Sequence, residues 1–86
     1  MDVLDGNALA GRLADLLGWD ATDSLVRCRA CGSLGAVAAT AVYATAMGLV
    51  ARCRACDAVL LTLVDAADGR SWVGMPGISA LEVRRA

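Results

Sequence analysis

Four cysteines in two identical pairs constrain this chain more than any other feature of its sequence. They are Cys28, Cys31, Cys53 and Cys56, and their spacing is C-x2-C-x21-C-x2-C with no cysteine left over. Two cysteines three positions apart on a tight turn can direct both sulfurs at one point about 2.3 Å away, which is the length of a zinc–sulfur bond. Two such turns facing each other complete a tetrahedron. The spacing therefore predicts a structural metal site with all four positions filled by protein.

The remaining composition explains why a chain of this kind needs such a site. Of its 86 residues, 18 are alanine and 9 are glycine, and there is no phenylalanine. A domain this short sits near the size at which a core alone barely offsets the entropy lost on folding, and small side chains bury little apolar volume. A structural metal contributes on the order of 10 to 16 kcal/mol of apparent binding energy, and this energy stabilises the fold.

Zinc is the metal that we expect, and three other uses of the cysteines are weaker. A single iron in a rubredoxin-like site would use the same thiolates, but the aromatic-poor composition (3%) argues against it. A dithiol oxidoreductase needs one CxxC beside a βαβ pattern, which is not seen here. Disulfides are disfavoured in a reducing compartment.

Hydrophobic patterning predicts an α+β domain, in which an N-terminal amphipathic helix packs on a small zinc ribbon. Residues 1–19 have the helical period, Asp5 or Asn7 can cap the start, and Gly18 supplies a left-handed residue to end the helix. Four of its leucines, Leu9, Leu13, Leu16 and Leu17, fall on one apolar stripe.

Beyond the helix, the pattern shortens to pieces of strand length. The expected strands are 25–27, 36–45, 49–52, 58–66 and 71–73, with turns at 46–48 and 68–69 and a closing segment at 78–83 that fits a helix or a strand. We expect about four antiparallel strands in hairpins. The domain organisation that follows is a helix and linker at 1–24, the zinc ribbon at 25–83 and a solvated tail at 84–86, in one structural domain overall.

An uncharged stretch of 20 residues, from 32 to 51, raises the question of a membrane span. Only seven of its residues are large and apolar, so two small-residue strands joined by a turn are the better interpretation. The acidic start of the chain, MDVLDGNALA, lacks the features of a secretory signal. We therefore expect a cytoplasmic protein without a membrane segment, in a compartment that keeps thiols reduced.

Half of the eight arginines flank the cysteine pairs, in the near-repeat RCRACG at 27–32 and RCRACD at 52–57. Two interpretations of Arg27, Arg29, Arg52 and Arg54 remain open. Four thiolates and one zinc carry a formal charge of −2 (four negative, two positive), and the guanidinium groups can simply offset it. Alternatively, they form a rim that binds phosphate or an acidic surface. The overall net charge of −1 lacks the basic footprint of a general nucleic-acid binder.

The sequence offers little for catalysis. It has no histidine and no lysine, and the metal uses every cysteine. Asp65 and Asp68 frame a glycine turn and are expected to be solvated rather than paired for acid–base work. Trp19, Trp72 and Met75 are expected mainly in the core, although each is a candidate for an exposed apolar patch of the kind that marks interfaces.

Several segments together resemble a family of short bacterial proteins of unknown function, found chiefly in high-GC Gram-positive bacteria and regarded as zinc-ribbon-like. The resemblance lies in LDGNALAGRLADLLG at 4–18, the two CxxC pairs, DAVLLTLV at 57–64 and GISALE at 77–82. It implies zinc ligation by the four cysteines and brings no established activity.

We therefore expect a nonenzymatic zinc-ribbon protein that acts as a protein–protein interaction or adaptor module, with a protein partner or a second copy of itself. A nucleic-acid-binding ribbon that uses the four flanking arginines is the main alternative. A small accessory subunit of an oxidoreductase is another, and an iron site would be its signature.

Overall fold

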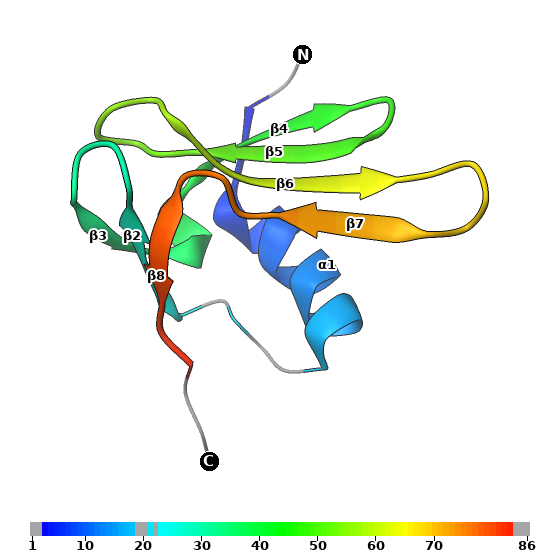
Figure 1. Cartoon of the computed structure of the whole chain (residues 1–86), viewed down its shortest axis with the longest axis horizontal. Helices are drawn as coiled ribbons and strands as arrows, with labels where there is room; N and C mark the ends of the chain where they lie inside the picture. The colour runs from blue at the N-terminus through cyan, green and yellow to red at the C-terminus, as the bar shows by residue number, and fades with distance from the viewer. Residues whose placement is uncertain (1–2, 19–20, 22, 84–86) are drawn as a thin grey trace.

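The computed structural model describes residues 3–18, 21 and 23–83, and these form two antiparallel sheets, one α-helix and a short 3-10 helix (Figure 1). In chain order the elements are β1 Val3–Asp5, α1 Gly6–Leu17, β2 Leu25–Cys28, β3 Leu34–Ala36, η1 Val37–Ala39, β4 Ala41–Thr45, β5 Gly48–Arg52, β6 Val59–Asp65, β7 Ser71–Gly74 and β8 Ile78–Leu81.

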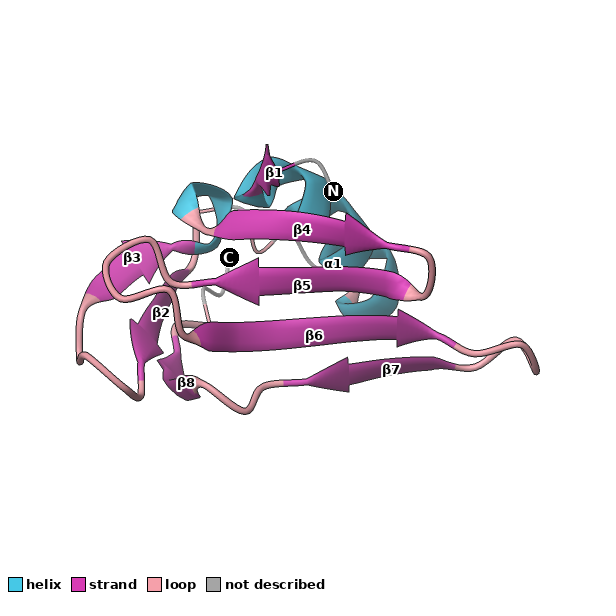
Figure 2. Cartoon of the chain, turned by 90° about the horizontal axis from the view of Figure 1, so that it is seen from above, coloured by secondary structure: helices cyan, strands magenta, loops and turns pink. Residues whose placement is uncertain are grey.

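The two sheets are built from separate hairpins. The large sheet has the order β1-β4-β5-β6-β7, and the small sheet has the order β3-β2-β8. Strands β4 to β7 form a meander, so each pairs with its neighbour in the chain, whereas β8 returns from the C-terminal end to pair with β2. Helix α1 lies on one face of the large sheet, beside the small sheet (Figures 1 and 2).

The helix is shorter than the expected range of 1–19. Residues Val3–Asp5 form an edge strand that pairs with β4, and the helix begins only at Gly6. Its end is as predicted, because Gly18 has a φ of 81° and its N–H donates to the carbonyl of Ala14 at 2.9 Å. A start at Gly6 agrees with Asp5 as the N-cap, but β1 was not predicted, because the β4 edge offers the first residues a strand partner that local periodicity does not reveal.

The expected strand at 36–45 is confirmed only in its second half, as β4, since this stretch passes from one sheet to the other. It ends β3, turns through η1 and then starts β4. Thr40 holds the turn, because its backbone N–H and its Oγ1 both donate to the carbonyl of Val37, at 3.1 and 2.8 Å. The start of α1 packs so tightly here that a Cβ on Gly6 would collide with the Val37 carbonyl. In total, the described part of the chain has eight strands, where about four were expected.

Prediction was most accurate in the C-terminal half. Strand β6 lies within the expected 58–66, and the turn at 68–69 leads to β7 as expected, with Gly69 at a φ of 87°. The segment at 78–83, whose type the sequence left undecided, contains β8. Strands β4 and β5 are joined at Ala46 and Met47, close to the expected turn.

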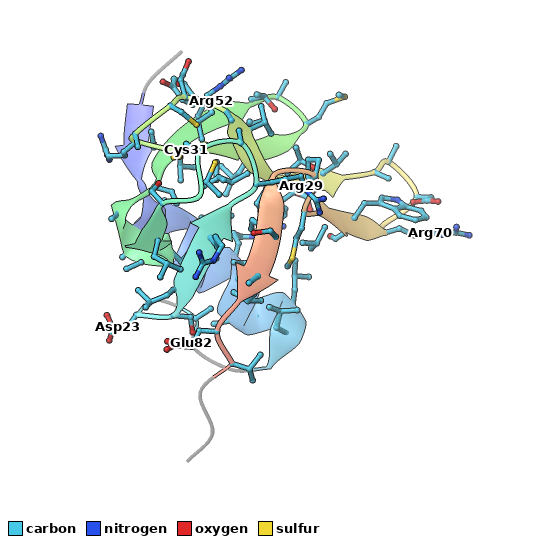
Figure 3. The ribbon with its side chains drawn as sticks, turned by 60° about the vertical axis from the view of Figure 1, so that its left-hand side comes forward. Asp23, Arg29, Cys31, Arg52, Arg70 and Glu82 are labelled. Atoms are coloured by element: carbon cyan, nitrogen blue, oxygen red, sulfur yellow. The ribbon has the colours of Figure 1, made fainter. Side chains whose placement is uncertain are left out.

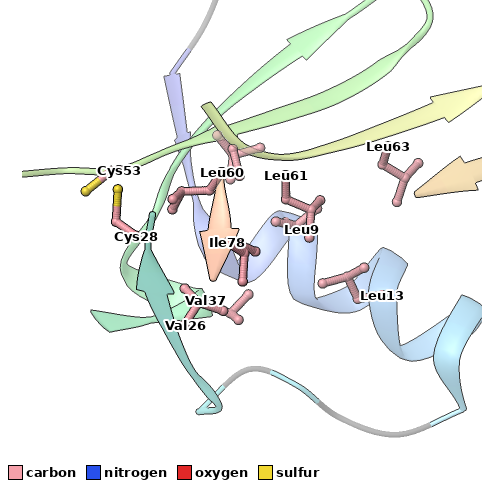
Figure 4. Packing of buried hydrophobic residues seen from close by; sticks show 12 residues of the cluster. Leu9, Leu13, Val26, Cys28, Val37, Cys53, Leu60, Leu61, Leu63 and Ile78 are labelled. Carbon is pink, nitrogen blue, oxygen red and sulfur yellow. The ribbon is translucent and has the colours of Figure 1, made fainter. Parts of the chain in front are cut away.

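The core lies between α1 and the two sheets (Figure 4). Alternation along β6 places Leu61 and Leu63 in it, at 3% and 0% exposure, and α1 contributes Leu9 and Leu13. Its other members come mainly from the small sheet and from β4 and β5: Val26, Cys28, Val37, Val42, Ala51, Cys53, Leu60 and Ile78. Two of the four cysteines are thus part of the core itself.

Some apolar side chains are not covered. Leu16 and Leu17, the second half of the expected leucine stripe, are 42% and 39% exposed. Trp72 is 59% exposed, so the expectation of core packing is wrong for it, whereas Met75 is partly buried against the core. Trp19 lies outside the described residues.

Within the described part of the chain, none of the helical segments has the length and apolar character needed to cross a bilayer. The uncharged stretch at 32–51 is instead divided among β3, η1, β4 and most of β5.

Candidate metal centre

Each sheet contributes one cysteine turn. The first knuckle, residues 28–33, connects β2 to β3 in the small sheet, and the second knuckle, residues 53–58, connects β5 to β6 in the large sheet. The two strands and turn expected within 32–51 are present as β4 and β5, but the 21 residues between the cysteine pairs also include β3 and η1 and pass from the small sheet to the large one. The two knuckles meet because the two sheets meet, and a metal between them would join the sheets.

The first knuckle is closed by two backbone hydrogen bonds. The N–H of Gly32 donates to the carbonyl of Cys28 at 2.8 Å, and the N–H of Cys28 donates to the carbonyl of Ser33 at 3.0 Å. Gly32 has a φ of 77°, a left-handed conformation that glycine adopts without steric cost. The knuckle is also fixed to the loop before β8, because the N–H of Arg29 donates to the carbonyl of Gly77 at 2.7 Å.

The second knuckle repeats this backbone. The N–H of Asp57 donates to the carbonyl of Cys53 at 2.8 Å, and the N–H of Cys53 donates to the carbonyl of Ala58 at 2.9 Å. Asp57 holds the left-handed position with a φ of 66°, and it is the only described residue other than glycine with a positive φ. The sequence near-repeat is therefore also a repeat of local structure.

The four sulfurs converge on one point, and together they form what we call the cysteine centre. All four Sγ atoms lie within 4.8 Å of one another. Two separations across the knuckles are 3.6 Å between Cys28 and Cys56, and 3.7 Å between Cys31 and Cys53. A regular tetrahedron of sulfurs about 2.3 Å from zinc has edges of about 3.8 Å, so these two distances fit a tetrahedral thiolate site.

Burial divides the cysteine centre into an inner and an outer half. Cys28 and Cys53, the first cysteine of each knuckle, are 2% and 7% exposed, whereas Cys31 and Cys56 are exposed. Figure 4 shows Cys28 and Cys53 side by side, near Leu60 at the edge of the core. A metal at this point would be anchored to the core on one side and would approach the surface on the other.

Ser33 makes the two outer thiols chemically different. Its hydroxyl lies 3.1 Å from the Sγ of Cys31, and this contact, with the Ser33 backbone N–H, lowers the pKa of Cys31 to about 6. For Cys56 the backbone N–H of Ala58 has a lowering effect, but loss of water and the neighbouring thiols outweigh it and raise its pKa to about 12. The pKa of Cys53 is lowered, chiefly by the backbone N–H of Cys56. Crowded sulfurs cannot all ionise without a cation, so these donors fit a metal ion.

Two of the four flanking arginines donate hydrogen bonds to nearby backbone carbonyls. Arg52 donates to the carbonyl of Asp57 at 2.9 Å, and its guanidinium carbon lies 5.9 Å from the centre of the Tyr43 ring. Arg54 donates from Nε to the carbonyl of Ala39 at 2.7 Å. Arg27 and Arg29 are exposed, and in Figure 3 Arg29 and Arg52 lie on different sides of Cys31. Two of the four guanidinium groups therefore already support the local backbone.

Asp65 and Asp68 each form an ion pair with an arginine. Asp65 makes a two-point ion pair with Arg12 on α1, with a shortest N–O distance of 2.7 Å, and accepts a hydrogen bond from Ser71 at 2.9 Å. Asp68 pairs with Arg70 at 3.3 Å. The Arg12 pair links the helix to the end of β6, a structural role that the sequence did not indicate.

Sequence reasoning located the four cysteines and missed the side chain that acts on them. Ser33 contacts Cys31 and lies 3.8 Å from the Sγ of Cys53. Its position, two residues after the second cysteine of its knuckle, is occupied by Ala58 in the second knuckle. This break in the near-repeat was the one available signal.

Comparison with protein families identifies the chain at the level of its family. A family model described as a family of unknown function (DUF6510) matches residues 1–86, and the chain belongs to this family. No curated protein matches the chain. No solved structure matches it either. The family brings no activity, so function has to be argued from the cysteine centre and the surface around it.

Proposed function

We propose that this chain is a nonenzymatic interaction protein in which Cys28, Cys31, Cys53 and Cys56 hold one structural zinc ion. The observation that carries the proposal is the pair of sulfur distances across the two knuckles, 3.6 and 3.7 Å, in a set that spans no more than 4.8 Å. Disulfides would require about 2.05 Å between sulfurs, and the four cysteines are free.

A structural role follows from the ligand count. Four protein sulfurs fill a tetrahedron and leave no position for water or substrate, which is typical of structural zinc and not of catalytic zinc. Because each sheet contributes one knuckle, the ion would join two sheets that otherwise share a core of small and medium-sized side chains. Metal binding of this kind supplies on the order of 10 to 16 kcal/mol, comparable with the whole stability of a small domain.

The cytoplasm is the compartment that suits zinc binding by four thiolates. Thiols stay reduced there and are available as ligands. Iron accepts the same four thiolates, and it would indicate an accessory subunit of a redox enzyme. Visible absorption by the purified protein distinguishes the two metals, because zinc has none.

The surface favours a protein partner over nucleic acid. Large apolar side chains are exposed around the sheets, including Leu34 at 55%, Met47 at 65% and Trp72 at 59%. Exposed apolar side chains of this kind are typical of protein interfaces. Arg52 and Arg54 each donate one guanidinium N–H to a backbone carbonyl, so fewer of their donors are available for phosphates. Metallation also shifts the formal net charge from −1 to about −3, because four thiols become thiolates around a divalent ion. The more negative charge weakens the attraction to nucleic-acid phosphates.

Native mass spectrometry of the protein purified from its own host tests the proposal in one measurement. We expect the mass of one zinc per chain and, at low activation, a complex with a protein partner or a second copy. A chain that carries no metal, or that carries iron, contradicts the zinc assignment. A metallated chain that is always monomeric and free of protein partners contradicts the interaction role.

A further inference from the structure

A cavity of about 190 Å³ opens beside the cysteine centre, at the junction of the two sheets. The inner cysteines Cys28 and Cys53 are among the residues that line it, together with Leu60 at the start of β6. It continues between β3 and the second knuckle, where its walls are made of small residues: Gly35, Ala36, Ala39 and Ala55. Most of these residues come from the alanine-rich stretch at 34–47. Its small side chains leave an apolar space that larger side chains would fill.

Arg54 places one positive charge on this cavity. It is among the lining residues, and its Nε donates to the carbonyl of Ala39, which lines the cavity too. The guanidinium group thus bridges the second knuckle and the end of η1. This bond uses Nε and leaves the two Nη groups, which are the atoms that bind a carboxylate in a two-point contact.

The volume decides what kind of group fits. Sites for whole small molecules have volumes of about 300 to 1,000 Å³, whereas a cavity of about 150 Å³ in another protein accommodates benzene. A space of 190 Å³ suits one aromatic or branched side chain. Leu34, which is 55% exposed and also lines the cavity, extends the apolar surface beyond it. This combination resembles the pockets that hold a single anchor residue at a protein interface.

We propose that this cavity receives one apolar side chain of a partner protein, and that a carboxylate next to that side chain pairs with Arg54. The proposal rests on the proposed interaction function and deepens it, since it names the surface and the chemistry of the partner segment. A cation beside the anchor would be repelled by Arg54, and a neutral segment would leave the guanidinium without its counterion.

N-acetyl-L-phenylalanine is a minimal probe, because it combines one apolar side chain with one carboxylate. Titrated into the full chain, it should shift the backbone amide NMR signals of Gly35, Ala36, Ala39 and Ala55 in a saturable way. For a ligand of this size we expect a dissociation constant on the order of 1 mM. N-acetyl-L-phenylalaninamide, which has the same side chain and no charge, should bind about fivefold more weakly.

The near-repeat supplies matched controls. Arg54→Gln keeps a donor for the Ala39 carbonyl and removes the charge, so it should weaken the acid about fivefold and leave the amide unchanged. Arg29→Gln makes the same change at the equivalent position of the first knuckle and should have no effect. Ala55→Leu should fill the cavity and abolish the shifts, whereas Ala30→Leu, its counterpart in the first knuckle, should preserve them.

Three results would overturn the proposal: no saturable shifts in the wild-type chain, equal binding of acid and amide, or equal effects of the variants in both knuckles. Tighter binding of 3-phenylpropanoate than of N-acetyl-L-phenylalanine would also overturn it, because the cavity would then prefer a free organic acid to a peptide segment. The titration is run on the full chain whatever metal it holds, so failure of the cavity proposal and failure of the zinc proposal are seen separately.

Discussion

The two knuckles have the same backbone and different surroundings. Both place their first cysteine in the core and their second at the surface, and both are closed by the same pair of hydrogen bonds. They differ in the left-handed residue, which is Gly32 in one and Asp57 in the other, and in the next residue, which is Ser33 in one and Ala58 in the other. The positions that set the sulfur geometry are thus repeated, while the positions that tune it are not.

This comparison separates residues that hold the metal from residues that adjust its environment. If the cysteine centre joins the sheets, equivalent cysteine variants should behave alike in both knuckles. Variants at the positions that differ should have opposite or unequal effects. The following predictions test this distinction, from the largest expected effect to the smallest.

Cys28→Ser and Cys53→Ser should each prevent stable folding. Each removes a ligand that is also a core residue, and the metal energy, on the order of 10 kcal/mol, matches the whole stability of a small domain. Cys31→Ser and Cys56→Ser should retain weak metal binding through three sulfurs and partial structure. Thermal unfolding followed by circular dichroism, with zinc analysis of each variant, checks both statements. Unequal behaviour of the two buried cysteines would break the equivalence of the knuckles.

Gly32→Ala and Asp57→Gly should change stability in opposite directions. Alanine at a φ of 77° costs about 1 to 2 kcal/mol, so the first variant should be destabilised by that amount. Glycine at Asp57 relieves the same kind of strain, and the ion pair that it removes is weak, with 3.9 Å between Arg52 and Asp57. We expect a gain of up to about 1 kcal/mol. Denaturant unfolding of both zinc-loaded variants measures this, and a loss of stability in Asp57→Gly would contradict the account.

Ser33→Ala should weaken metal binding without unfolding the chain. The Ser33 hydroxyl contacts the sulfur of Cys31 at 3.1 Å, and loss of a hydrogen bond to a metal ligand commonly lowers affinity about tenfold or more. Ala58→Ser, which introduces a hydroxyl at the equivalent position of the second knuckle, should not reduce affinity. Competition with a coloured zinc chelator gives the zinc dissociation constants of both variants. Equal affinities in wild type and Ser33→Ala would show that this hydroxyl does not act on the metal.

Asp65→Asn should have the smallest effect and should leave the cysteine centre unchanged. Hydrogen bonding to Arg12 holds the pKa of Asp65 below its usual value. The contribution of Asp65 to stability is therefore present above the unfolded carboxyl pKa of about 3.9 and is lost as pH falls through the lower folded value. The variant should be slightly less stable at neutral pH and should match the wild type in strong acid. Melting curves recorded from neutral to strongly acidic pH check the sign of this stability difference. A change in zinc affinity would contradict the independence of the Arg12–Asp65 pair and the cysteine centre.

The sequence predicted the two cysteine knuckles well because the signal for each is local. Cysteines three positions apart need only a tight turn to converge, and nothing distant can alter that spacing. The same holds for β6, whose run of valine and leucine dictates a strand, and for the glycines at 18 and 69, which end a helix and form a turn.

The parts that prediction missed depend on distant partners. Residues Val3–Asp5 lie within the expected helical range of 1–19 but pair with β4, and β8 pairs with β2 from the far end of the chain. The stretch at 36–45 reads as one strand because alanine, valine and threonine do not show where η1 changes direction. The bond between Arg54 and Ala39, which both line the cavity, joins residues 15 positions apart. No local pattern encodes these contacts.

The central claim is that a metal held by both knuckles keeps the two sheets together, and chelation tests it most directly. The full chain is dialysed against a strong zinc chelator under reducing conditions, and its backbone amide NMR spectrum is recorded before and after. We expect the dispersed signals of both sheets to collapse and to return when one equivalent of zinc is added. A metal-free chain that keeps its dispersed spectrum and unfolds cooperatively at the same temperature as the loaded protein would contradict the account.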